Sequence, residues 1–134
     1  MTRIVPELEV PPLRVSRITR TTLALFAGAS GDRNPIHIDL DVARAAGLDD
    51  VFAQGMLSMA YLGRLLTRLV PQGALRSFSV RFAAITPLYA EPICTGTART
   101  MDDREATLTL QVALADGTVT LRGEAVIDLS ALNQ

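Results

Sequence analysis

The sequence contains few of the residues that mark specialised classes of protein. Its 134 residues include no tryptophan, a single histidine and a single cysteine, Cys94. One cysteine cannot form an internal disulfide and lacks the paired spacing of a zinc site, which fits a reducing compartment. We therefore expect Cys94 to be a small core residue in a strand.

Charge of one sign and long apolar runs are also lacking. Lys and Arg number 13 against 14 Asp and Glu, so a formal net charge of −1 provides no global field for nucleic acid or an anionic membrane. The longest apolar segment, residues 55–70, is interrupted by Arg64 and Arg68 and is too short to cross a bilayer. Residues 1–12 have no apolar block of the kind that a secretory signal needs. We expect a cytoplasmic protein with no membrane or nucleic-acid partner.

The length and hydrophobicity of the chain favour one folded core. A chain of 134 residues with a hydrophobic fraction of 49% falls at the usual size of one domain. We therefore expect a single domain over residues 1–134. Prolines at positions 6, 11 and 12 predict an extended arm over residues 1–12, and a short strand is expected within residues 13–18.

The first half of the chain predicts helices. A short helix begins near Thr21, with Leu23 and Leu25 on its apolar face, and a second short helix is capped by Asp39 or Asp41. A longer helix covers residues 55–70, where Ser58 is one of a few polar positions that recur every three or four residues. That helix is expected to be buried over most of its circumference.

The second half changes to a two-residue rhythm. Alternating apolar residues predict strands of a half-buried antiparallel sheet, and Asp116-Gly117 predicts a two-residue type I′ turn between the last two. A further strand near residues 92–100 brings the total to four or five. The expected fold class is α+β, with an antiparallel sheet wrapped around the central helix. The alternating residues are Phe78, Val80 and Phe82, then Leu108, Leu110, Val112 and Leu114, then Val119, Leu121, Ala125 and Ile127.

The only histidine lies five residues after an aspartate, in a loop stiffened by Pro35. An imidazole exchanges protons near neutral pH and a nearby carboxylate can hold a water, so Asp32 and His37 are a candidate acid–base pair. The alternative is that Asp32 shapes the loop and His37 is a satisfied core residue. A metal site with Asp39 and Asp41 is disfavoured, because these two are better placed as helix caps.

Gly55 begins the predicted central helix. Its N–H has no intrahelical partner, lies at the positive end of the macrodipole and is not shielded by a side chain, which describes an oxyanion hole. Alternatively, the glycine only permits a sharp entry into the helix. Met56, the next residue, is either core filler or part of a ligand-binding wall.

Three stretches together resemble a known family. Residues 30–39 read SGDRNPIHID, residues 55–58 read GMLS and residues 80–82 read VRF. In order and spacing these are similar to the MaoC-like (R)-specific enoyl-thioester hydratases and dehydratases, which have a hot-dog fold. The resemblance extends over roughly residues 13–129.

The resemblance implies a reaction and a set of roles. Asp32 and His37 would add water reversibly across the double bond of a trans-2-enoyl thioester, which gives an (R)-3-hydroxyacyl thioester. Gly55 would donate its N–H to the thioester carbonyl, and Asn34 and Met56 are assigned to the oxyanion and substrate-binding region. Asn34 and Pro35 also match the loop-shaping positions of the motif. No metal and no cofactor is implied beyond the coenzyme A or carrier-protein phosphopantetheine of the substrate itself.

The resemblance also implies a partner and leaves two alternatives. Such domains pair sheet edge to sheet edge, so a homodimer is expected, with a heterodimer with a paralogue as the other option. The alternative functions are a hot-dog acyl-thioesterase and a non-catalytic acyl-binding subunit of a heterodimeric dehydratase. Two departures from the family pattern are Gln54, where histidine is common, and the turn at residues 89–91, where Gly-Asp is common.

Overall fold

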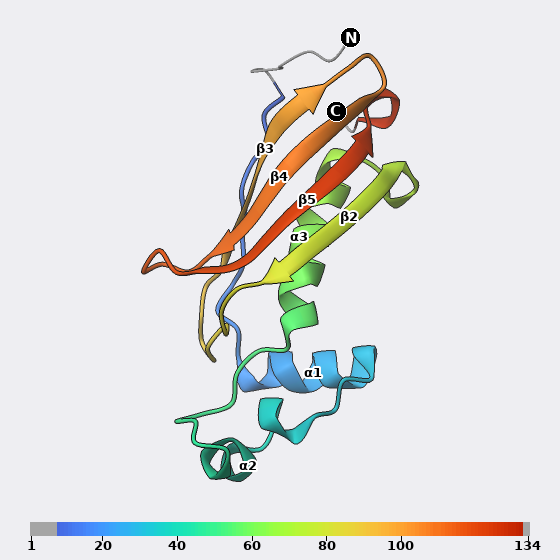
Figure 1. Ribbon diagram of the computed structural model, residues 1–134. Coiled ribbons are helices and arrows are strands. Elements are labelled where there is room, and N and C mark those ends of the chain that lie inside the picture. Colours follow the sequence, from blue (N-terminus) through green and yellow to red (C-terminus); the bar gives the residue numbers. More distant parts are fainter. Residues whose placement is uncertain (1–7, 133–134) are drawn as a thin grey trace.

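The computed structural model describes residues 8–132, and it confirms the predicted α+β architecture (Figure 1). Five antiparallel strands form one sheet in the order β1-β3-β4-β5-β2. The strands are β1 Leu13–Arg14, β2 Leu75–Phe82, β3 Ile93–Met101, β4 Glu105–Ala113 and β5 Val119–Asp128. The helices are α1 Arg20–Ser30, η1 Pro35–His37, α2 Leu40–Ala45, α3 Gly55–Leu69, η2 Gln72–Ala74 and η3 Leu129–Ala131.

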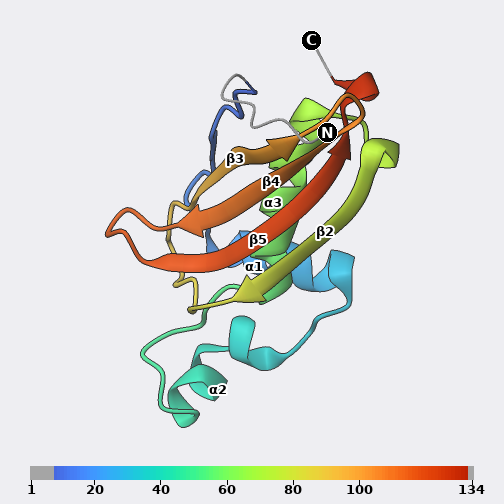
Figure 2. The same ribbon diagram turned by 45° about the horizontal axis from the view of Figure 1, so that its top comes forward.

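The core lies between α3 and the concave face of the sheet. In β4 every second residue from Ala106 to Val112 is buried, which is the alternation expected of a strand with one covered face. In α3 Leu62, Leu65 and Leu66 are at most 1% exposed. Helices α1 and α2 lie toward the end of the sheet at which α3 begins (Figure 1), and α2 lies beyond that end in both views (Figure 2).

The N-terminal segment is described only in part. The predicted arm over residues 1–12 lies outside the described residues up to position 7, and residues 8–12 form neither helix nor strand. The strand expected within residues 13–18 is β1, where Leu13 pairs with Cys94 of β3. Cys94 is fully buried in that strand, as predicted, and burial raises the pKa of its thiol to about 11. No helix among residues 8–132 has the length and hydrophobicity to span a membrane.

Three details of the sequence prediction were wrong. Leu25 is 70% exposed, because the core-facing side of α1 is formed by Leu23 and Ala27 instead. Ser58 is buried, although the helical pattern assigned it to a polar face. The turn between β4 and β5 is a three-residue loop closed by bonds from Gly117 N to Leu114 O and from Leu114 N to Thr118 O.

That loop differs from the predicted type I′ turn in its backbone angles. A type I′ turn needs positive φ at both central residues. Gly117 has a φ of 90°, whereas among the described non-glycine residues only Tyr89 has a positive φ. The Asp-Gly pair therefore supplies the left-handed residue that ends a type I turn, and the hairpin has one more loop residue than predicted.

Candidate active site

The loop that follows α1 begins with a left-handed glycine. Gly31 ends α1 with a φ of 81°, and its N–H donates to Ala27 O at 3.1 Å. The chain then turns through Asp32, whose N–H donates to Ser30 Oγ at 3.1 Å and whose Oδ1 accepts from Asn34 N at 3.4 Å. Bonds to residues two positions away therefore hold both the backbone and the carboxylate of Asp32.

A short 3-10 turn carries the histidine. Asn34 caps this turn, because its Oδ1 accepts from Ile36 N at 3.1 Å, and Pro35 follows at the first position, where a missing N–H costs nothing. Asp39 then caps α2 by accepting from Asp41 N at 2.9 Å. The loop is thus fixed at both ends of the turn that presents His37.

His37 is nearly buried and its ring has one defined orientation. Nδ1 lies 2.8 Å from Phe52 O, and the edge of the Phe52 ring meets the imidazole with centroids 4.8 Å apart at 77°. A carbonyl oxygen can only accept, so Nδ1 carries a proton and donates it to Phe52. In the neutral ring Nε2 is then the atom with a lone pair.

The free nitrogen of His37 faces the carboxylate of Asp32. Nε2 lies 3.9 Å from Asp32 Oδ2, which is too long for a direct hydrogen bond. One water oxygen can lie about 2.8 Å from both atoms at that separation. The Asp32 side chain is 41% exposed and that of His37 only 10%, so the pair has one face open to an incoming molecule. The structure therefore brings Asp32 and His37 together, as the sequence predicted.

Gly55 is the first residue of α3, and the space above it is closed to a side chain. A Cβ built there would lie 2.9 Å from Phe82 Cε1 and 3.0 Å from Phe82 Cδ1. The N–H of a first helical residue has no intrahelical partner and lies at the positive end of the helix. Gly55 thus offers a donor suited to an oxygen that gains negative charge.

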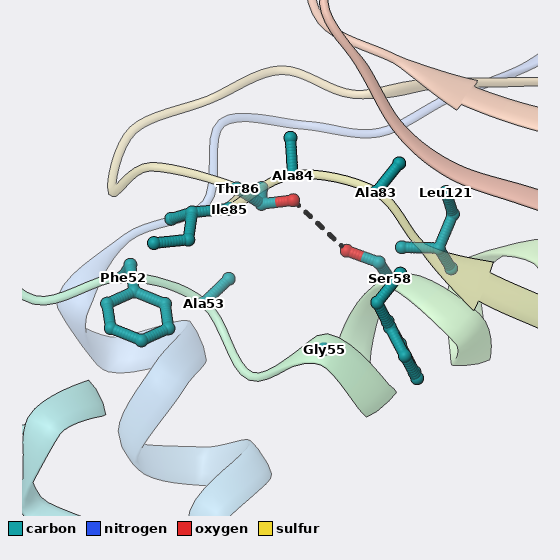
Figure 3. Close-up of a pocket in the computed structure, with 10 residues that line it drawn as sticks. Phe52, Ala53, Gly55, Ser58, Ala83, Ala84, Ile85, Thr86 and Leu121 are labelled. Atoms are coloured by element: carbon teal, nitrogen blue, oxygen red, sulfur yellow. Dashed lines mark hydrogen bonds between the residues drawn. The ribbon is translucent and has the colours of Figure 1, made fainter.

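A mostly apolar cavity of about 320 Å³ opens beside Gly55 (Figure 3). Small and apolar residues line it, and Ser58 and Thr86 share a hydrogen bond of 3.3 Å across it. Phe52 belongs to this lining and also holds His37 through its carbonyl, so one residue joins the cavity to the acid–base pair. The lining residues are Phe52, Ala53, Gly55, Ser58, Phe82, Ala83, Ala84, Ile85, Thr86 and Leu121.

Asn34 and Met56, the other two predicted site residues, lie outside the lining of this cavity. Asn34 shapes the loop through its cap and does not line the cavity. Met56 is 52% exposed and also lies outside the cavity lining. The sequence prediction missed Phe52 and Thr86, since nothing in the local pattern indicates that a carbonyl holds the histidine or that a threonine beyond the end of β2 meets α3. No three His, Cys, Asp or Glu side chains within the described part of the chain are grouped closely enough to hold a metal ion.

The turn at residues 89–91 lies on the chain segment that leads away from the cavity. Tyr89 has a φ of 70°, a left-handed conformation that costs energy for a bulky residue. Its N–H donates to Ile18 O at 2.7 Å and the Arg17 guanidinium lies 4.3 Å from the centre of its ring, so both contacts hold it in place. A glycine would adopt this angle without strain.

Known proteins are similar to this chain in sequence and in fold. A family model described as the MaoC like domain matches residues 6–100. The (R)-specific enoyl-CoA hydratase of Rhodospirillum rubrum is 30% identical over 117 residues, which cover 85% of this chain and 81% of that protein. The chain belongs to the MaoC-like hydratase and dehydratase family.

Two further matches agree with this assignment to the MaoC-like family. A solved (R)-hydratase from A. caviae, described as involved in PHA biosynthesis, superimposes with a TM-score of 0.80 at 27% identity and covers 93% of this chain and 99% of that one. The 3-hydroxyacyl-thioester dehydratase X of Mycobacterium tuberculosis is 36% identical over 73 residues, 54% of this chain. The matched region spans 25% of that longer protein. The five-stranded sheet around α3 is therefore the hot-dog fold of MaoC-like hydratases.

Proposed function

We propose that this MaoC-like protein hydrates trans-2-enoyl thioesters reversibly to (R)-3-hydroxyacyl thioesters. The observation that supports it most is the separation of 3.9 Å between His37 Nε2 and Asp32 Oδ2, together with a helix start at Gly55 that the Gln54 side chain does not cap. Addition of water to a conjugated thioester needs a group that takes a proton, a group that returns one and a donor for the carbonyl oxygen. Asp32 and His37 are proposed to take and return the proton, and Gly55 N–H is the proposed donor to the carbonyl oxygen.

The chemistry follows from the fixed tautomer of His37. Because Nδ1–H is committed to Phe52 O, Nε2 accepts a proton from the water held between it and Asp32. The water oxygen bonds to C3, the C2–C3 double bond opens and its electron pair moves toward the thioester oxygen. Gly55 N–H stabilises that oxygen, and the His37–Asp32 pair returns one proton to C2. The atoms balance without a redox step. The proposed reaction uses no metal and no cofactor besides the coenzyme A or phosphopantetheine of the substrate.

The apolar cavity beside Gly55 is proposed to take the acyl chain. Its lining is mostly alanine and larger apolar side chains, which fits a hydrocarbon rather than a polar group. Gly55 lies both on this lining and at the start of α3. A thioester carbonyl at the Gly55 N–H would therefore have its hydrocarbon tail at the cavity mouth.

A second copy of the chain is the proposed partner. Strand β2 pairs only with β5 among the described strands, which leaves its other edge open along eight residues. Phe82 and Ile85, at and beyond the end of β2, are 55% and 53% exposed. Pairing of two β2 edges would cover both features. Sedimentation is expected to give a dimer at micromolar concentration, and a monomer alone would contradict this part of the proposal.

A hot-dog acyl-thioesterase is the alternative activity, and the composition of α3 argues against it. Such enzymes usually take a carboxylate from the central helix, and none of the 15 residues of α3 is Asp or Glu. A non-catalytic acyl-binding subunit is the other alternative. The acid–base geometry of Asp32 and His37 argues against that role.

One assay separates the three functions. Purified protein is mixed with crotonyl-CoA and with longer enoyl-CoAs, and both the conjugated-thioester absorbance and the release of free thiol are followed. We expect loss of absorbance without thiol release, and a product of R configuration by chiral chromatography. Thiol release would identify a thioesterase. Acyl-CoA binding without either change would identify the non-catalytic subunit.

A further inference from the structure

Gln54 is a fully buried polar residue directly before the proposed oxyanion donor. It is 0% exposed, and its Nε2 donates to Leu23 O of α1 at 3.0 Å. Its Oε1 has no hydrogen-bond partner among residues 8–132. The side chain does not cap α3, although its backbone occupies the N-cap position. Gln54 therefore points back toward α1 and away from the helix it precedes.

Stability does not account for an amide at this position. Leu23 lies inside α1, so its carbonyl already accepts the regular helical bond from Ala27 N. The bond from Gln54 is thus an additional one, while the unpaired Oε1 is a desolvated acceptor that destabilises the folded state. An apolar side chain of the same length would fill the space without that penalty. Unlike an apolar group, the amide forms a directional hydrogen bond, which fixes the orientation of the Gln54 side chain relative to α1.

The two ends of this bond belong to the two parts of the candidate site. Helix α1 ends at Gly31, and Asp32 follows at once, so the position of α1 sets where the carboxylate lies. Gln54 immediately precedes Gly55, so the same bond sets where the start of α3 lies. At the surface Arg20 and Asp50 also connect these segments at 2.8 Å, but their side chains are 46% and 36% exposed, and exposed ion pairs hold geometry weakly.

We propose that Gln54 is a positioning residue that fixes the Gly55 N–H relative to Asp32 and His37. The inference rests on the proposed hydratase function, because it assigns Gln54 a task in that reaction. A displacement of about 1 Å between a catalytic group and its substrate lowers a rate by about a hundredfold. Loss of the bond therefore lowers kcat, while the substrate still binds through its acyl chain and carrier.

The test compares Gln54→Met with Gln54→His and Asp50→Asn. Methionine matches glutamine in length but has no amide, so we expect kcat to fall by about 10- to 100-fold, with KM changed less than about threefold. The melting temperature should stay level or rise, because the unpaired acceptor is gone. Gln54→His retains a ring N–H as donor and should recover at least part of kcat. Asp50→Asn breaks only the surface pair and should leave kcat within about twofold.

A second readout does not depend on activity. In 15N–1H spectra the amide signal of Asp32, which is far from position 54 in the sequence, should shift in Gln54→Met and stay in place in Asp50→Asn. Wild-type kcat in Gln54→Met would overturn the inference, and so would a joint loss of melting temperature and kcat, which marks a purely structural residue. An inactive wild-type protein would instead refute the proposed function, while the Asp32 signal would still decide whether the Gln54 bond couples the start of α3 to the Asp32 loop.

Discussion

The loop that carries Asp32 and His37 is held mainly by its own neighbours, whereas the start of α3 is held by residues far away in the chain. In the loop, Ser30 Oγ accepts from Asp32 N and Asn34 Oδ1 accepts from Ile36 N, each across two positions. At the start of α3, Gln54 bonds to a residue 31 positions away and Ser58 to one 28 positions away. Substitutions in the loop should therefore act locally, and substitutions near Gly55 should act through other elements.

A hydrogen bond from His37 joins the loop itself to the segment before α3. His37 Nδ1 donates to Phe52 O, 15 residues ahead and three residues before Gly55. The histidine is thus oriented by the segment that leads into α3, while Asp32 is oriented by the end of α1. The comparison predicts that Asp32 can be replaced without structural cost and His37 cannot.

The largest expected effects come from the acid–base pair. Asp32→Asn and His37→Ala should each lower kcat by about 10³-fold or more, because proton transfer to and from the water is lost. Asp32→Asn should keep the wild-type free energy of unfolding, since its side chain is 41% exposed. His37→Ala takes away the histidine partner of the part-buried Phe52 carbonyl and should cost about 1–3 kcal/mol. Enoyl-CoA hydration and urea unfolding measure the two quantities.

Asp49→Asn is the matched control for the pair, because Asp49 is an exposed aspartate outside the site. It should keep both the wild-type kcat and the wild-type stability. Wild-type rates in either site variant would remove the pair from the mechanism. Equal stability losses in Asp32→Asn and His37→Ala would contradict the difference between a locally held and a distantly held residue.

The second effect concerns the helix side of the site. Gly55→Ala places a methyl 2.9 Å from Phe82 Cε1, which is the far end of a side chain that can rotate aside. The free energy of unfolding should therefore change by less than about 1 kcal/mol. The same methyl blocks the approach to the N–H, so kcat should fall by about 100-fold.

A double variant distinguishes two causes of that loss. If the methyl itself excludes the substrate oxygen, Phe82→Ala added to Gly55→Ala will not restore kcat, and this is the expected result. Full recovery in the double variant would show that displacement of the ring, rather than blockage of the N–H, had lowered the rate. The assignment of Gly55 as the carbonyl donor would then fail.

The buried hydroxyl pair gives the third effect, on stability. Ser58→Ala leaves Thr86 Oγ1 without its partner at a site where Thr86 is only 4% exposed, so the free energy of unfolding should fall by about 1–3 kcal/mol. Replacing both hydroxyls, with Ser58→Ala and Thr86→Val, should be nearly neutral. Urea unfolding of the single and double variants measures the coupling. Additive losses would mean that the two residues act independently.

The same contrast explains how far the sequence could predict the site. The loop was predictable in part: Pro35 marked a stiff segment and Asp39 was expected as a cap, whereas an extended chain was predicted where the structure has the 3-10 turn capped by Asn34. The central helix was predictable from its apolar spacing, and it ends within one residue of the expected position. The roles of Gln54 and Ser58 were not, since their partners lie in α1 and beyond β2. The prediction for the Asp116-Gly117 turn was wrong for a related reason. The Asp-Gly pair suits both two-residue and three-residue hairpin loops, and the pairing of Ala113 with Val119 in the two strands selects the three-residue loop.

The smallest effect expected tests whether Asn34 belongs to the local frame or to the substrate site. Asn34→Ala removes the cap from Ile36 N and should cost about 1 kcal/mol of stability, with kcat lowered several-fold because the turn that presents His37 loosens. KM should change by less than about twofold, because Asn34 does not line the cavity. Asn34→Asp keeps an acceptor oxygen for Ile36 N and should restore most of kcat. A large rise in KM in both variants, with kcat unchanged, would instead place Asn34 in contact with the substrate. It would contradict the conclusion that Asn34 acts only on the backbone of its own loop.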